Sequence, residues 1–168
     1  MTNLRYVVLD RDGVINEDSD DFIKSPDEWQ PIESSLEAIA LLNRHHYAVV
    51  VISNQSGIAR GYFDEVELAA IHAKMQAMLA NVNGKIAAIY YCPHGPDCLC
   101  ACRKPKPGLL VQFAGDTGAE LAETWCVGDS LRDIQSAQAA GAKPILVLTG
   151  KGRQTLCNER ALSSPGFG

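Results

Sequence analysis

The sequence lacks a hydrophobic run long enough to span a membrane, and its first ten residues lack the long apolar stretch and cleavage site of a signal peptide. It has no internal repeat, and only the Gly-, Ser- and Pro-rich tail after Leu148 is predicted to be loosely structured. It also lacks a basic excess, because its net charge is −5. We therefore expect a cytoplasmic protein with no membrane partner and no nucleic-acid partner.

The length and composition predict one folded domain. The chain has 168 residues, of which 46% are hydrophobic and 21% are charged. A chain of this size buries roughly two-thirds of its unfolded surface, so it needs no cross-links to fold. We expect a single domain over residues 1–168 that acts as a monomer.

Short apolar runs alternate with segments of helical periodicity. Leu36, Ile39 and Leu42 keep helical spacing, and Asp64 and Glu67 form a capping pattern before a second helix. This alternation predicts an α/β fold, a Rossmann-like three-layer sandwich with a central parallel sheet. The predicted strands are Tyr6–Leu9, Ala48–Ile52, Ile86–Tyr91, Thr124–Val127 and Pro144–Leu148.

Polar or metal-binding residues follow each of the first four apolar runs. Because ligands of such sheets bind beyond the carboxyl ends of the strands, we expect these four groups to meet in one crevice. The groups are DRDG from Asp10, SNQSG from Ser53, CPH from Cys92 and GDSLRD from Gly128.

The aspartates of the first and fourth groups predict a magnesium site. Carboxylates without a nearby histidine suit Mg²⁺, so we assign Asp10 and Asp129 as side-chain ligands and Asp12 as a ligand through its backbone carbonyl. Asp10 can then attack phosphorus, and the side chain of Asp12 remains available for proton transfer. Alone, the DRDG motif would be a capped turn, and a calcium loop would need further acidic ligands. The two motifs together favour phosphoryl transfer through an aspartyl-phosphate.

Phosphoryl transfer also requires hydrogen-bond donors and cations around the phosphoryl oxygens. Ser53 and the backbone N–H groups of Asn54 and Gln55 are candidate donors, although Ser53 alone could cap a helix. Lys104 is the candidate phosphate-binding cation and Arg103 a candidate substrate contact. The alternative for this RKPKPG run is a solvated basic turn.

Four of the six cysteines lie within eleven residues. Cys92, His94, Cys100 and Cys102 make a four-ligand set for Zn²⁺, which would be structural because no position stays open. Cys98 could replace one ligand, and the alternatives to zinc are free thiols or a disulfide. The zinc-binding loop would hold the segment that carries Arg103 and Lys104.

The segments DRDGVIN, VISNQSGIARGYF, YYCPH with CxCRKPKPG, and VGDSLRD together resemble the haloacid dehalogenase superfamily, and within it the heptose-1,7-bisphosphate 7-phosphatase family. The resemblance implies Mg²⁺, a zinc loop and removal of the C7 phosphate of D-glycero-D-manno-heptose 1,7-bisphosphate during synthesis of nucleotide-activated heptose for surface glycans such as lipopolysaccharide. It implies that Asp10 is the nucleophile, Asp12 the general acid and base, and Asp129 a magnesium ligand. Catalytic Ser53 and Lys104 would hold the phosphoryl group, and Arg103 would recognise the substrate. The residues implied to line the sugar site are Asp18, Asp21, Phe22, Ser53, Asn54, Gln55 and Ser56.

No cap domain fits between the motifs, because helices, strands and the zinc loop already occupy the intervals. Histidinol-phosphate phosphatase is an alternative that shares the aspartates, the zinc loop and the RKP run, and the segment GIARGYF favours the heptose family over it. A non-enzymatic phospho-receiver domain is a second alternative. It would lack both the zinc loop and an acid for turnover two residues after the nucleophile.

Overall fold

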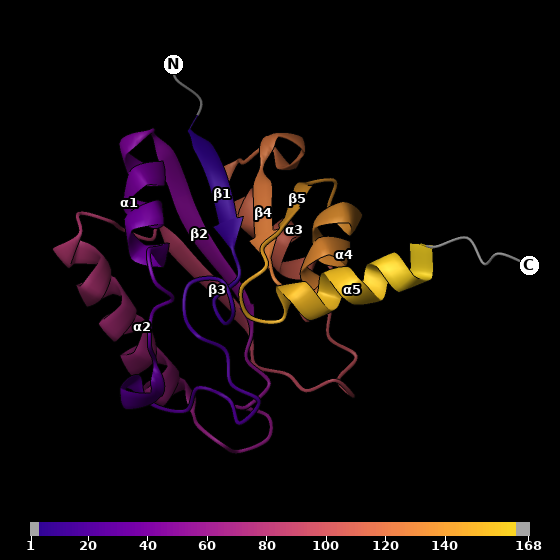
Figure 1. The fold of residues 1–168 in the computed structure, drawn as a ribbon, viewed down its shortest axis with the longest axis horizontal. Helices are drawn as coiled ribbons and strands as arrows, with labels where there is room; N and C mark the ends of the chain where they lie inside the picture. Colours follow the sequence, from indigo (N-terminus) through magenta and orange to yellow (C-terminus); the bar gives the residue numbers. More distant parts are fainter. Residues whose placement is uncertain (1–3, 164–168) are drawn as a thin grey trace, which may run out of the picture.

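The computed structural model describes residues 4–163 and has a five-stranded parallel sheet at its centre (Figure 1). The strand order is β3-β2-β1-β4-β5. All five predicted strands are confirmed, with bounds shifted by one or two residues. They are β1 (Arg5–Leu9), β2 (Tyr47–Asn54), β3 (Ala88–Cys92), β4 (Trp125–Gly128) and β5 (Lys143–Leu146).

Helices cover both faces of the sheet. The helices α1 (Ser35–Arg44) and α2 (Glu65–Asn81) pack on one face, and α3 (Gly108–Thr117) and α4 (Leu131–Ala139) pack on the other (Figure 1). Alternate residues of a strand serve the two cores: in β1, Leu9 joins the core beneath α1 and α2, whereas Val8 joins the core beneath α3 and α4. The central strands β1 and β2 carry the apolar runs at residues 7–9 and 49–52 because both of their faces are buried. The predicted three-layer sandwich is confirmed.

Two helix starts are held by aspartate side chains. Asp64 Oδ1 accepts a hydrogen bond from the Glu67 N–H at 2.9 Å, which confirms the predicted start of α2. At α4, Ser130 and Asp133 form a reciprocal capping box directly after β4. This box anchors the segment that follows Gly128 at the carboxyl end of the sheet.

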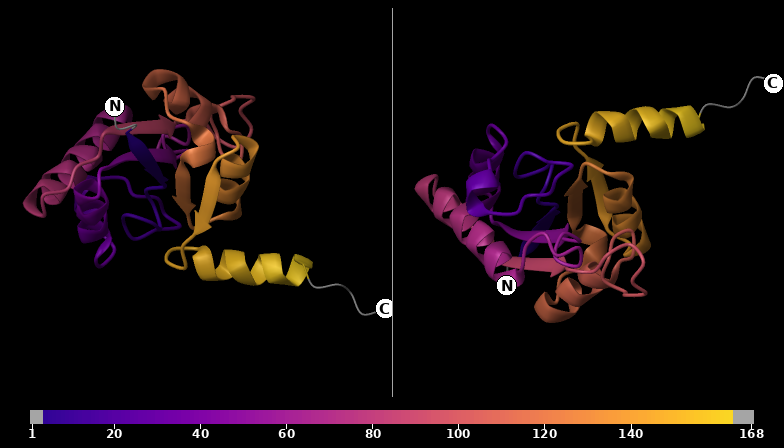
Figure 2. Two further views of the ribbon diagram at one scale, coloured as in Figure 1. Left: turned by 90° about the horizontal axis from the view of Figure 1, so that it is seen from above. Right: turned by 90° about the horizontal axis from the view of Figure 1, so that it is seen from below.

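The prediction of a loose tail after Leu148 is wrong for residues 152–163, which form α5 (Gly152–Ser163). Figure 2 shows that α5 extends away from the sheet. The start of α5 is tied to the end of β4, because the Lys151 N–H donates to Asp129 Oδ2 and Thr155 Oγ1 donates to the Asp129 carbonyl. The helix was missed because the sequence from residue 152 onward shows no regular apolar spacing. Residues 164–168 lie outside the described part of the chain.

Long connections surround the carboxyl end of the sheet. Residues 10–34 join β1 to α1 and include a 3₁₀ helix at Pro26–Glu28; residues 93–107 join β3 to α3, and a second 3₁₀ helix at Leu121–Glu123 precedes β4. Within residues 4–163 no separate cap domain is inserted between these elements. Among these residues, no helix has the length and apolarity needed to cross a membrane.

Candidate active site

A pocket of about 340 Å³ opens beyond the carboxyl ends of β1, β2 and β4. The register pairs Leu9 of β1 with Val51 of β2 and Val127 of β4, so the residues after these strands start at one level. Residues of three of the four predicted groups, those after β1, β2 and β4, therefore meet in the pocket, whereas the CPH group from Cys92 does not line it and contributes to the Cys/His cluster instead. The lining includes Asp10, Asp12, Asn54, Gln55, Ser56, Arg103, Lys104, Asp129, Ser130 and Asp133.

Lys104 bridges two carboxylates at the floor of this pocket. Its Nζ lies 3.3 Å from Asp10 Oδ1 and 2.8 Å from Asp133 Oδ1. Burial alone would lower the pKa of Lys104, but Asp10 and Asp133 raise it above its usual value. Lys104 is only 7% exposed and nevertheless stays charged. A buried positive charge is suited to binding phosphoryl oxygens.

Asp10 and Asp129 hold protons more strongly than ordinary aspartates. Burial raises the pKa of Asp10, and the charge of Asp133 adds to the effect. Burial likewise raises the pKa of Asp129 to about 6, although the hydrogen bond from the Lys151 N–H opposes the rise. Because burial is the larger cause of both shifts, each ionised carboxylate lacks part of the solvation that its charge would have in water.

Asp12 has the opposite environment. Burial opposes its ionisation, but the Arg11 guanidinium and hydrogen bonds from Asn16 and Gln55 hold the pKa of Asp12 below its usual value. Arg11 Nε donates to Asp12 Oδ1 at 2.9 Å, and the fully buried Arg11 in turn contacts His72 Nε2 at 3.2 Å. Asp12 and Asp10 thus have different protonation preferences although only one residue, Arg11, separates them.

Residues at the end of β2 and directly after it form hydrogen bonds that hold Asp12 and Lys104 in position. Gln55 Nε2 donates to Asp12 Oδ2 at 3.2 Å and to Ser53 Oγ at 2.8 Å. Asn54 uses its side chain to accept from the Lys104 N–H and to donate to the Lys104 carbonyl. The Gln55 N–H, a predicted phosphate donor, instead donates to the Cys92 carbonyl at 2.8 Å. Ser53 is 1% exposed and is not among the residues that line the pocket.

The predicted sugar-site residues are distributed unevenly around the pocket mouth. Asp18 and Phe22 line it, as does Ser56 after β2. Asp21 is exposed and does not contribute to the lining. Asp18 Oδ2 lies 3.5 Å from Lys151 Nζ, so this loop is linked to the start of α5.

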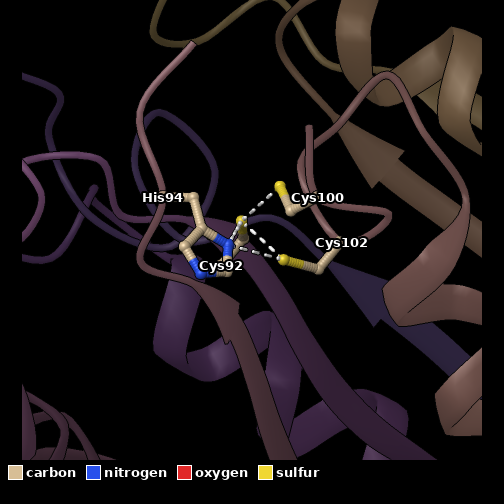
Figure 3. Close-up of side chains that lie close together, drawn as sticks. All are labelled: Cys92, His94, Cys100 and Cys102. Carbon is tan, nitrogen blue, oxygen red and sulfur yellow. Dashed lines mark hydrogen bonds between the residues drawn. The ribbon is translucent and has the colours of Figure 1, made fainter. Parts of the chain in front are cut away.

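The predicted zinc ligands come together at the end of β3. Their ligand atoms all lie within 4.8 Å of one another, and Figure 3 shows the three sulfurs and the imidazole turned toward a common point. His94 presents Nδ1, which is 3.5 Å from Cys92 Sγ and 3.3 Å from Cys102 Sγ. Three thiols and one imidazole suit a tetrahedral zinc site. Cys98 is exposed and is not part of the cluster.

The cluster adjoins the substrate-facing residues. Cys102 directly precedes Arg103, whose NH1 donates to the His94 carbonyl at 3.3 Å. Burial opposes ionisation of Cys100, but the Arg103 N–H and the neighbouring thiols lower the pKa of Cys100 to about 6. Burial instead raises the pKa of Cys92 to about 12 and also raises the pKa of Cys102. A thiolate is the form that binds zinc, so a bound ion would offset the rise at these two ligands.

A second group of potential metal ligands consists of Asp10, Asp129 and Asp133. Asp133 Oδ1 accepts from Lys104, and its Oδ2 accepts from Ser130 Oγ and two backbone N–H groups. Asp133 therefore holds Lys104 and the N-terminus of α4 in place. Asp10 and Asp129 keep more of their lone pairs for a hard cation, which agrees with the assignment made from the sequence.

Several residues of this site were not predicted. A charged Arg11 between two aspartates gave no sign that it would be buried, and nothing in α2 marked His72 as its partner. Asp133 could have been found, because Ser130 and Asp133 have the spacing of a capping box. Lys151 lies in the segment predicted to be loose.

Known proteins resemble this chain closely. A family model described as HAD-hydrolase-like matches residues 101–165. The D-glycero-beta-D-manno-heptose-1,7-bisphosphate 7-phosphatase of Pseudomonas aeruginosa is 54% identical over 150 residues, covering 89% of this chain and 84% of that protein. The protein of the same name from Neisseria meningitidis serogroup A is 52% identical over 153 residues, covering 91% of this chain and 82% of the relative.

A solved structure agrees with the sequence comparison. It is the D,D-heptose 1,7-bisphosphate phosphatase from B. bronchiseptica complexed with magnesium and phosphate. The TM-score is 0.90 at 53% sequence identity, and the match covers 92% of this chain and 86% of the other.

Proposed function

The chain belongs to the heptose-1,7-bisphosphate 7-phosphatase family of the haloacid dehalogenase superfamily, and we propose that it is a magnesium-dependent phosphatase that hydrolyses the C7 phosphate of D-glycero-D-manno-heptose 1,7-bisphosphate. The observation that carries the proposal is the close match to a solved phosphatase of this name that holds magnesium and phosphate. The meeting of Asp10, Asp12, Lys104 and Asp129 in one pocket supports the same chemistry.

In the proposed first step, a carboxylate oxygen of Asp10 attacks phosphorus and the bond from phosphorus to the C7 oxygen breaks. Asp12 delivers a proton to the departing C7 oxygen, and an aspartyl-phosphate remains on Asp10. Lys104 holds a phosphoryl oxygen from the floor of the pocket. Bound phosphate brings negative charge close to Asp12, which raises the pKa of this carboxyl and favours the proton that the step consumes.

In the second step, Asp12 accepts a proton from water while the water oxygen attacks phosphorus, and Asp10 leaves as a carboxylate. The contacts of Arg11, Asn16 and Gln55 with Asp12 support this role, because they favour the ionised carboxylate that acts as the base. The same residue thus protonates the sugar oxygen and deprotonates water.

We propose that Asp10, Asp129 and the backbone carbonyl of Asp12 hold Mg²⁺. The ion would offset negative charge on the carboxylates and on the transferring phosphoryl group. We also propose that Cys92, His94, Cys100 and Cys102 hold a structural Zn²⁺ that fixes the loop carrying Arg103 and Lys104. The closeness of the four ligand atoms supports this assignment.

We propose further that residues 1–168 act as one domain, as a monomer, in the cytoplasm. None of the six cysteines forms a disulfide, which agrees with a reducing compartment. The enzyme would serve the synthesis of nucleotide-activated heptose.

The test is a phosphatase assay with both anomers of the heptose bisphosphate, histidinol phosphate and an aryl phosphate, each with and without Mg²⁺. We expect release of one phosphate from the bisphosphate, retention of the phosphate at C1, and loss of activity with chelator. Asp27→Asn is a matched control for Asp10→Asn, because Asp27 is exposed and lies outside the pocket.

Each alternative has its own outcome in this assay. Preferential hydrolysis of histidinol phosphate would replace the proposed substrate. A protein that accepts phosphate on Asp10 without turnover would be a receiver domain, and activity in Asp10→Asn equal to that of Asp27→Asn would refute the mechanism.

A further inference from the structure

The two carboxylate oxygens of Asp12 have unequal contacts. Oδ1 accepts from Arg11 Nε and from Asn16 Nδ2, each at 2.9 Å, and it lies 2.8 Å from Arg11 NH2. Oδ2 accepts from Gln55 Nε2 at a longer 3.2 Å. Oδ1 is therefore the tethered oxygen, and Oδ2 keeps more of its lone pairs for taking up and releasing a proton.

The guanidinium that tethers Oδ1 is itself held from its other end. Arg11 is 0% exposed, and while its Nε and NH2 face Asp12, its NH1 lies 3.2 Å from His72 Nε2. Arginine has donors only, so His72 supplies the acceptor through a neutral ring nitrogen. Because the guanidinium is a rigid planar fork, contacts at both ends fix its orientation.

His72 has a fixed position because it lies on a well-packed helix. Its neighbours on α2, Ile71 and Met75, are fully buried in the core beneath α1 and α2, and His72 itself is 9% exposed. Asp12, by contrast, lies in the long connection between β1 and α1. A side chain on a packed helix is placed more precisely than one on a loop, so α2 supplies a fixed point that this connection lacks.

We propose that His72 is a positioning residue for the reaction: through Arg11 it fixes Oδ1 of Asp12, so that Oδ2 exchanges the proton with the leaving oxygen and with water. The inference rests on the proposed function, in which Asp12 is the acid and the base. Without an acceptor at position 72, Arg11 NH1 loses its partner and the guanidinium is free to turn away from Asp12. A small displacement of a group that transfers a proton is enough to slow the step.

The experiment compares kcat/KM for two substrates that differ in their need for an acid. Heptose 1,7-bisphosphate loses a sugar oxygen that must be protonated, whereas 2,4-dinitrophenyl phosphate loses a phenolate that leaves without a proton. We expect His72→Leu to lower kcat/KM for the bisphosphate about ten- to hundredfold and that for the aryl phosphate much less. His72→Gln should restore the wild-type ratio, because the glutamine oxygen and Nε2 are separated from Cα by the same number of bonds.

A double variant tests whether His72 acts through Arg11. Arg11→Met should lower the ratio as His72→Leu does, and Arg11→Met/His72→Leu should lower it no further. The double variant also leaves no buried charge without a partner, so it should fold even if His72→Leu alone does not. Leu79→Ala is the control and should keep the wild-type ratio, because it removes buried volume from α2 about two turns beyond His72.

The outcomes separate this inference from the proposed function. A wild-type ratio in folded His72→Leu, or in Arg11→Met, would overturn the inference and leave the proposed function intact, because the wild-type protein would still hydrolyse the bisphosphate. Equal losses on both substrates that His72→Gln does not recover would give His72 a merely structural role and also overturn it, as would a further loss in the double variant. Wild-type protein that does not hydrolyse the bisphosphate would overturn the proposed function, and the inference with it.

Discussion

Replacing His72 by glutamine should make folding stability less sensitive to acid. His72 on α2 is 9% exposed, and its Nε2 lies 3.2 Å from NH1 of the fully buried Arg11. An arginine only donates hydrogen bonds, so the His72 nitrogen accepts and the ring is neutral. A glutamine can offer an oxygen to Arg11 without gaining a proton at low pH.

The size of the effect follows from the pKa of His72. Burial and the charge of Arg11 lower this pKa from 6.5 to about 4. In the unfolded chain His72 gains a proton as the pH falls below 6.5, whereas in the folded chain it does so only near pH 4. The unfolded state thus binds more protons between these values, and stability falls as the pH falls. A difference of this size is equivalent to about 3 kcal/mol when fully expressed.

Urea unfolding at pH 7 and pH 4.5 provides the measurement. The wild-type free energy of unfolding should fall by about 2–3 kcal/mol more than that of His72→Gln. Groups such as Asp129 also titrate in this range, but they are present in both proteins and cancel in the difference. The control is His45→Gln, because His45 is exposed on the surface at the end of α1. Identical pH dependences of the wild type and His72→Gln would refute the reasoning.

Three other substitutions test the site. Asp10→Asn should abolish turnover and leave the circular dichroism spectrum unchanged, because an amide is a poor nucleophile. Cys100→Ser should reduce zinc content by metal analysis and raise KM, whereas Cys98→Ser should change neither; zinc loss in the second variant would reassign the ligands. Gly13→Ala should lower the affinity for Mg²⁺ in titration calorimetry. Its Cβ would overlap Asp129 Oδ2, and the backbone φ of +84° disfavours a side chain; wild-type affinity would show that Asp129 can move without consequence.

The sheet was predictable because its strands are short apolar runs, and the central strands β1 and β2 are largely buried on both faces. Each of the five apolar runs became a strand, and the residues after β1, β2 and β4 met in one pocket as expected from parallel topology. The Cys/His cluster was equally predictable from the sequence, because its four candidate ligands are close together in the chain. Within the sheet, only the bounds of the strands differed from those predicted.

The parts that escaped prediction depend on contacts between distant segments. Arg11 contacts His72 across 61 residues of sequence, and neither residue type is expected in a core. The start of α5 is held by Asp129, to which Lys151 and Thr155 donate hydrogen bonds. Such polar contacts leave no periodic signal in a single sequence.

The charges of the pocket give a physical reason for the proposed metal. Asp10, Asp129 and Asp133 each place a carboxylate oxygen within 4.8 Å of the others, and Lys104 is the cation that contacts Asp10 and Asp133. When all four groups are ionised, two negative charges remain unbalanced. The ionised forms of Asp10 and Asp129 are disfavoured, and their pKa values are raised. The contacts of Lys104 and the α4 N-terminus instead lower the pKa of Asp133.

The opposite pKa shifts distinguish the proposed metal ligands, Asp10 and Asp129, from Asp133, which holds Lys104 in place. A divalent cation beside Asp10 and Asp129 would remove the imbalance and keep the nucleophile ionised at a pH where a proton would otherwise compete for it. A cation bound through Asp133 would instead have to displace Lys104 or the hydrogen bonds at the start of α4. The cluster therefore favours a metal held by Asp10 and Asp129, with Asp133 keeping Lys104 directed at the position of the phosphoryl group.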